Sequence, residues 1–390
     1  MGDPTHVYLN LDVVNNSTTT SQPLVFNETR NMPFLTNSQD YFCSVVRFTL
    51  QTSNSLPVFI PDILTGQSDY NKTVYAITMS LTQITTSVPS GEKTYTTKIK
   101  SEYIQYARQD ATVPLPSPPS TRVDTSSSYY FVYNINDWVD MINLCFKQLT
   151  NELITAFSST FSFNQPFITY DISSGLFTIH SDNSMDFIGS GGTFDLSIGF
   201  NSRLYNILPF SSLKLPNSLD TETPSFGTIY RLNLFNKSDS NISIIYSSSE
   251  VAERYIILQT EFSPISIMNP IRNVYFTTNT LPIVPTLVSP PKILGDTNIS
   301  VSSVSGDLSN IIADYSIPVS AQNNYNGEII YAPSAEYRLL SMNSSTNLNR
   351  IDIQAFWESK TGLSYPIYMP PGTCSNIKLL FRHVRFNISY

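Results

Sequence analysis

Three histidines are the first residues to test for metal chemistry, because zinc sites combine nitrogen and sulfur ligands at short, recurring spacings. His6, His180 and His383 lie far apart in the chain, and no Cys-x-x-Cys or His-Glu-x-x-His pattern accompanies them. A zinc-dependent hydrolase would therefore need a site built from distant segments. We expect no metal ligands and no other cofactor.

Nucleophilic catalysis would need an activated serine or cysteine, often in a Gly-x-Ser-x-Gly turn or beside a histidine. The sequence contains no such turn. Cys374 and His383 are close enough to share one hairpin, although Cys374 beside Gly372 is easily explained as part of a turn. The glycine run 189–192 lacks the Lys-Ser/Thr that completes a phosphate-binding loop, and we interpret it as a flexible turn. We predict no catalytic residues.

Carboxylates are harder to exclude, because glycosidases bring two of them together from distant strands. Asp352, Glu358, Glu336 and Glu261 are available for such a pair. No pattern singles them out, and most carboxylates are solvated on protein surfaces. A glycosidase stays open as an alternative, and it would require two carboxylates about 5–9.5 Å apart in one groove.

Aromatic side chains could instead bind sugars or nucleobases. Tyr and Phe number 23 each, and the densest cluster is 128–133 (SYYFVY). No basic residues interleave with this run, as nucleic-acid binding would require, so we predict that its rings belong to a core or an interface. An alternative of another class is a carbohydrate-binding attachment module that uses tyrosines or Trp357 as sugar platforms.

Charge argues against nucleic acid as a direct partner. The formal net charge is −8, and the 22 Lys and Arg are scattered rather than gathered into a basic arm. Phosphate binding needs such a cluster. No uninterrupted apolar stretch approaches the ~18 residues that span a bilayer, so we expect no membrane span. The three distant cysteines, Cys43, Cys145 and Cys374, suit buried thiols better than disulfides.

Short runs rich in Val, Ile, Tyr, Phe and Thr, separated by turn residues, predict an all-β sandwich or barrel. Tyr75, Ile77, Met79 and Leu81 alternate with polar residues, which indicates a strand with one buried face. The predicted strands are 6–14, 41–50, 73–84, 93–106, 127–133, 167–170, 175–180, 194–200, 204–208, 226–235, 242–247, 254–262, 308–319, 327–332, 335–342, 350–357, 364–369 and 375–388.

One amphipathic helix is predicted at 137–157, where apolar residues recur at helical spacing. Asn136 or Asp137 would cap its N-terminus, and its apolar side would pack on a sheet.

Six prolines between Pro264 and Pro291 should prevent a long central strand or helix there. We therefore predict two jelly-roll sandwiches, residues 1–265 with the helix and residues 266–390 after the proline-rich connection.

Three stretches of the C-terminal third are familiar: 331–340 (YAPSAEYRLL), 351–357 (IDIQAFW) and 378–382 (KLLFR). Two earlier stretches, 129–143 (YYFVYNINDWVDMIN) and 200–209 (FNSRLYNILP), add to this pattern. In these stretches the chain resembles the jelly-roll capsid proteins of polinton-like viruses, adintoviruses and virophages. They are packing motifs without catalytic groups.

The resemblance implies a structural protein of the icosahedral capsid of a double-stranded DNA virus, assembled in the cytoplasm or nucleus of the host cell. Such particles use one protein as trimers on their faces and another at their five-fold vertices. Two sandwiches favour the double jelly-roll major capsid protein, which forms trimeric capsomers. The alternative is a single jelly-roll penton or minor capsid protein. Expected partners are copies of the chain itself, as trimer or pentamer, and other capsid proteins.

Overall fold

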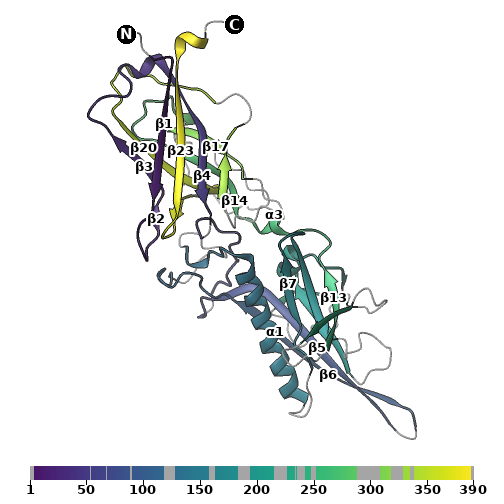
Figure 1. The fold of residues 1–390 in the computed structure, drawn as a ribbon. Helices are drawn as coiled ribbons and strands as arrows, with labels where there is room; N and C mark the ends of the chain where they lie inside the picture. The colour runs from purple at the N-terminus through teal and green to yellow at the C-terminus, as the bar shows by residue number, and fades with distance from the viewer. Residues whose placement is uncertain are drawn as a thin grey trace. The chain divides into compact units, whose positions relative to one another are not determined.

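The computed structural model describes most of the chain. It describes residues 1–390 except 1–3, 53, 67, 88–89, 118–127, 158–162, 183–193, 215–225, 233, 235–241, 247–251, 288–307, 318–327, 334–337 and 388–390. Within these residues the chain forms antiparallel sheets with few helices, which confirms the predicted all-β, jelly-roll class of fold (Figure 1).

The chain divides into two compact units, and the first unit is built from three separate segments. Residues 1–57, 270–318 and 325–390 form unit 1, whereas 58–269 and 319–324 form unit 2. The predicted division at 265 and 266 therefore does not match the contacts. It fails because the N-terminal strand pairs along its whole length with the C-terminal strand, from His6 opposite Arg382 to Val14 opposite Cys374.

Unit 1 is a sandwich of two sheets. The first sheet has the order β1 (His6–Val14), β23 (Cys374–His383), β4 (Tyr41–Gln51) and β18 (Glu328–Tyr331), with β19 (Leu340–Ser341) also on β4. The second has the order β17 (Ile311–Tyr315), β14 (Ile271–Thr277), β20 (Arg350–Ser359) and β21 (Ser364–Pro366), with β3 (Val25–Thr29) also on β20. Short pairs complete the unit: β2 (Gln22–Pro23) with β22 (Tyr368–Met369), and β15 (Thr286–Leu287) with β16 (Leu308–Ser309).

Buried aromatic rings join the two sheets of unit 1. Phe48 of β4 meets Phe276 of β14 edge-on, with ring centroids 4.7 Å apart, and Phe26 of β3 approaches Phe48 from the side. All three rings are fully buried. Strand β14 occupies a central position of its sheet, although it lies in the proline-rich region. Pro270 and Pro282 bound this strand without interrupting it, so every residue of β14 keeps its amide for pairing.

Unit 2 has two sheets and one long helix. One sheet has the order β10 (Ser212–Lys214), β11 (Ile229–Leu232), β9 (Phe194–Asn201), β5 (Lys72–Thr86) and β6 (Lys93–Gln105). The other has the order β12 (Ile242–Tyr246), β13 (Ala252–Gln259), β8 (Leu176–Asp182) and β7 (Phe167–Asp171). The helices of unit 2 are α1 (Ile135–Phe157), α2 (Ser202–Ile207) and α3 (Ile265–Met268). The described residues also include 3-10 segments at Ser128–Tyr130 in unit 2 and at Ser38–Asp40 and Val384–Asn387 in unit 1.

Helix α1 begins two residues before its predicted start. The side chain of Asn134 accepts the amide of Asn136 at 3.0 Å, and its carbonyl accepts the amide of Asp137. Asn134 therefore caps the helix, in place of the predicted Asn136 or Asp137, because only a residue outside the helix can turn its side chain back to the first free amides. The buried side of α1 packs on β6, β7 and β5, as predicted.

Two predicted strands have other conformations. The stretch predicted as strand 127–133 contains a 3-10 turn, Ser128–Tyr130, and a single bridge between Val132 and Phe59; residue 127 lies outside the described residues. The predicted strand 204–208 is part of α2, because the side chain of Asn201 accepts the amide of Leu204 and starts a helix there.

Candidate assembly surfaces

The candidate nucleophile and its histidine do not meet. Cys374 is the first residue of β23 and His383 is the last, so they lie about 30 Å apart at about 3.3 Å per residue. They share a strand and not a hairpin turn, which makes that interpretation wrong. The ring of His383 is buried against Tyr41, with centroids 5.1 Å apart.

The two carboxylates on β20 are also separated. Asp352 and Glu358 lie on the same strand about 20 Å apart, which is too far for a glycosidase pair. Glu358 is held by Arg272 at 3.4 Å, and Asp352 accepts the amide of Asn279 at 3.0 Å. Both carboxylates therefore have local structural partners.

The other sequence candidates supply no reaction centre. Glu261 is exposed in unit 2, whereas Glu336 and the glycine run 189–192 lie outside the described residues. Across the part of the chain that the structure describes, no three His, Cys, Asp or Glu side chains are grouped closely enough to hold a metal ion.

Trp357, the candidate sugar platform, is part of the core of unit 1. It is 1% exposed, and its ring stacks on Tyr365 with centroids 4.4 Å apart. A sugar could not reach this ring without unfolding β20. Trp357, the one tryptophan proposed as a sugar platform in the attachment-module alternative, therefore cannot have that role.

The dense aromatic run is buried, as predicted. Tyr129, Tyr130, Phe131 and Val132 are all buried in unit 2. The hydroxyl of Tyr106 donates to the carbonyl of Tyr129 at 2.5 Å, and burial raises the pKa of Tyr106 above its usual range. These rings fill a core and present no stacking platform to solvent.

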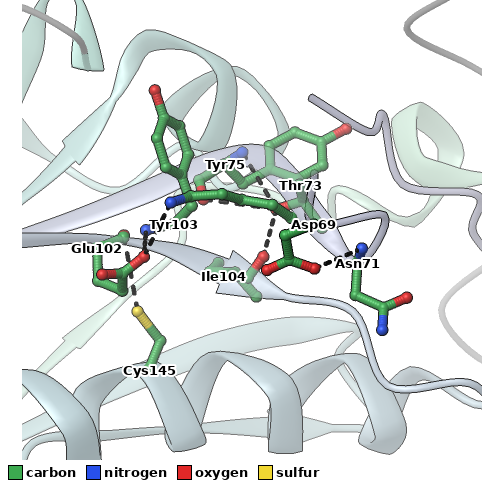
Figure 2. Close-up of polar contacts among 9 residues, drawn as sticks. Asp69, Asn71, Thr73, Tyr75, Glu102, Tyr103, Ile104 and Cys145 are labelled. Carbon is green, nitrogen blue, oxygen red and sulfur yellow. Dashed lines mark hydrogen bonds and ion pairs between the residues drawn. The ribbon is translucent and has the colours of Figure 1, made fainter. Parts of the chain in front are cut away.

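A bulge at the start of β5 shapes this core (Figure 2). The register slips between Lys72 and Ala76, so three residues of β5 face one residue of β6. The hydroxyl of Thr73 donates to the carbonyl of Ile104 at 2.8 Å and accepts the amide of Tyr75. A buried side chain thus replaces the missing ladder bond.

Asn201 supports the same bulge from β9. Its side chain accepts the amide of Ala76 at 3.1 Å and donates to the carbonyl of Val74 at 2.8 Å. Asn201 is 3% exposed, and it also caps α2. The bulged strand directs Tyr75 at Trp138, with ring centroids 5.5 Å apart. The bulge of β5, the N-terminal cap of α2 and the position of Tyr75 in the aromatic core therefore all depend on the side chain of Asn201.

The outer face of the first sheet of unit 1 carries a polar network. Arg47 donates to Asn376 Oδ1 at 2.9 Å, and Asn376 Nδ2 donates to Asp12 at 2.6 Å and to Asn10 at 3.0 Å. The network links β4, β23 and β1 across the sheet. The alternation in β1, with Leu9 and Leu11 buried between exposed polar residues, is the sequence signal for this face.

Large apolar side chains are also exposed on unit 1. Tyr8 is 57% exposed beside this network, with Lys378 Nζ 5.0 Å from its ring centroid. Val14 and Ile330 are each 63% exposed. Such groups are frequent where subunits meet.

A ribbon formed by β5 and β6 is the second exposed feature. Residues 93–98 of β6 are all exposed, and Tyr95 is 61% exposed. These residues were predicted as strand and not as a surface. The available signal was the run 93–98 (KTYTTK), in which Tyr95 is flanked by Lys and Thr and no apolar alternation occurs.

No helix within the described residues has the length and apolar character required to cross a membrane.

A comparison with protein families identifies the family of this chain. The model of the Sputnik minor capsid protein V18/19 family matches residues 7–383, nearly the whole chain and both units. The chain belongs to this family. Membership makes it a virophage capsid structural protein of the virion and not an enzyme, in agreement with the sequence-based prediction.

Two Sputnik virophage proteins are similar in sequence to this family member. The uncharacterized protein V18 is 26% identical over 136 residues, which cover 34% of this chain and 73% of V18. The structural protein V19 is 27% identical over 140 residues, which cover 35% of this chain and 61% of V19. Each match therefore spans only part of both proteins.

Two solved structures share the fold of this family member. A chain of the 3.5 Å cryo-EM structure of the Sputnik virophage has a TM-score of 0.74 at 21% identity, with 99% of each chain covered. The crystal structure of the mavirus penton protein has a TM-score of 0.58 at 15% identity, with 98% of this chain and 100% of that chain covered. At these identities the likeness concerns the fold.

Proposed function

We propose that this minor capsid protein is the penton protein, which occupies the five-fold vertices of an icosahedral shell as a ring of five copies. The family match to minor capsid proteins over residues 7–383 carries the proposal. The fold likeness to the mavirus penton protein supports it, because that likeness includes both units. The predicted face-tiling, trimeric major capsid role has no comparable support among these relatives.

The physical properties of the chain fit a ring. A cyclic ring is closed by a heterologous interface, in which two different surfaces of one subunit meet their complements on its neighbours. Unit 1 has two such different outer faces. One bears the Arg47–Asn376–Asp12 network, and the other bears Tyr275 stacked on Phe356, with centroids 5.6 Å apart.

The test is the oligomeric state of the purified chain. Size-exclusion chromatography with light scattering should give a mass of five times 43.7 kDa, and electron microscopy should show five-fold rings. Trimers would instead support the face-tiling role. A monomer at every concentration would contradict both, unless a second capsid protein restores the ring when the two are mixed.

A further inference from the structure

The β5–β6 hairpin extends beyond the sheet to which it belongs (Figure 1). Within the described residues, which resume at Phe194, strand β9 pairs with β5 as far as Gln83, whereas β5 and β6 stay paired to Thr86 opposite Lys93. We name residues 84–86 and 93–99 the β5–β6 arm; its two-stranded end is 84–86 with 93–95, whereas 96–99 lie opposite residues of β5 that also pair with β9. A two-stranded ribbon alone in water is marginally stable. The geometry of the arm is therefore that of a strand pair that gains stability when it packs against a neighbouring molecule.

One face of the arm carries apolar groups. Ile84 and Tyr95 are directly opposite in the ladder, so their side chains lie on the same face. Ile99 lies four residues from Tyr95 on that face, and between them the hydroxyls of Thr82 and Thr97 are hydrogen-bonded at 2.9 Å. Tyr95 offers the large, rigid contact area that anchors protein interfaces.

The charge of the arm selects the kind of partner. Lys93 and Lys98 are exposed on β6, while Lys100, next to the arm, pairs with Glu152 of α1 at 3.7 Å. Lysines on an edge strand oppose unselective strand pairing. They permit contact with an acidic surface, and this chain itself has a net charge of −8.

We propose that the β5–β6 arm docks on a neighbouring copy of this chain in the assembled ring, with Tyr95 as the anchor and Lys93, which lies on the same face of β6, facing acidic groups of the neighbour. The inference rests on the proposed self-assembly and adds a contact surface in unit 2 to the two outer faces of unit 1. Another capsid protein as the partner of the arm is an outcome that the test separates.

The test compares oligomer dissociation of the full chain with that of the double variant Ile84→Thr, Tyr95→Ser. Both new residues suit an exposed strand, so unit 2 should keep its unfolding midpoint. Light scattering across a dilution series should show an association affinity at least about tenfold weaker. Tyr368→Ser, at an exposed tyrosine of β22 in unit 1, is the matched control and should assemble normally.

A charge reversal tests the second part of the proposal. Lys93→Glu should weaken association, and 0.5 M salt should reduce the difference from the unaltered protein, because salt screens charges at exposed contacts.

The outcomes separate the two proposals. If the unaltered chain forms rings and the Ile84→Thr, Tyr95→Ser variant forms them equally well, the arm inference is overturned while the penton proposal stands. The same result, together with loss of binding to another capsid protein, would assign the arm to that protein instead. If the unaltered chain stays monomeric, the self-assembly proposal fails first.

Discussion

In both units two sheets pack around an aromatic core. The units differ in the order in which their strands follow one another along the chain. In unit 2, β5 with β6, β7 with β8 and β12 with β13 are hairpins of consecutive strands. In unit 1, β23 lies between β1 and β4, which come from the other end of the chain. Hairpins of consecutive strands therefore supply much of unit 2, whereas the first sheet of unit 1 is built by pairing the two ends of the chain.

The two tryptophans allow this comparison to be tested, because Trp138 lies in unit 2 and Trp357 in unit 1. Trp138→Ala should destabilise unit 2 by about 3–5 kcal/mol, since the ring is fully buried against Phe59 and Tyr75. Urea unfolding followed by Trp357 fluorescence should then be unchanged. A shift of the Trp357 transition by the same amount would show that the units unfold as one.

Two buried asparagines offer a more detailed comparison. Asn201→Ala removes three hydrogen bonds in unit 2, to Ala76, Val74 and Leu204, and should cost unit 2 about 2–4 kcal/mol.

The matched change in unit 1 is Asn15→Ala, which removes bonds to Thr20, Met369 and Ser17. It should cost about 1–3 kcal/mol, because two of these bonds are only partly buried. Urea unfolding followed by Trp138 fluorescence should detect the loss of stability in Asn201→Ala, and unfolding followed by Trp357 fluorescence should detect the loss in Asn15→Ala. An Asn201→Ala variant as stable as the original would contradict the role given to the bulge.

Alkaline pH should weaken unit 1 through a buried thiol. Burial raises the pKa of Cys43 from 9.0 to about 12. Between these values the unfolded chain loses the proton that the folded chain keeps, so stability is complete below pH 9 and falls as pH rises. The slope should approach about 1.4 kcal/mol per pH unit. Cys43→Ala should flatten the pH dependence of the Trp357 transition, and an unaltered slope would assign it to other groups.

The smallest effect is expected on the outer face of unit 1. Asn376→Ala breaks the network between Arg47 and Asp12, but water can replace these partners. The loss should be below about 1 kcal/mol in urea unfolding. A loss as large as that of Asn15→Ala would mean that the network is part of the structural core.

Strand alternation and helical periodicity were sufficient for many elements. The predicted strand 6–14 is β1 without change, and the predicted helix 137–157 differs from α1 by two residues at its start. In both cases the spacing of the apolar residues along the sequence alone determines which face of the element is buried. The short strands β2 and β3 were missed, since Gln22–Pro23 and Val25–Thr29 are too short or too polar to show a period.

The failures have physical causes. The run 128–133 is apolar without alternation, so no period distinguishes a strand from the 3-10 turn that forms. Asn201 could have signalled the helix cap at α2, but Ile and Leu after it favoured a strand. The unit boundary depends on β23 pairing with β1 and β4, and no local pattern specifies a partner that distant.

The candidate surfaces were harder to predict than the fold. That the chain is not an enzyme could be anticipated from its motifs, and the family comparison agrees with that prediction. The polar network could have been found from β1, because Asn10 and Asp12 share a face in any strand. Its partners Arg47 and Asn376 could not, since they join it only after β4 and β23 pair.

The position of β23 has a consequence for synthesis on the ribosome. Residues 58–269 of unit 2 emerge as an unbroken stretch and can fold while translation continues, whereas β1 and β4 must wait for residues 374–383 to lie between them. A chain released before residues 374–383 are made leaves the edges of β1 and β4 without the strand that pairs with both, and the core of unit 1 is then incomplete. The first sheet of unit 1 therefore becomes complete only after the whole 58–269 segment of unit 2 has been synthesised.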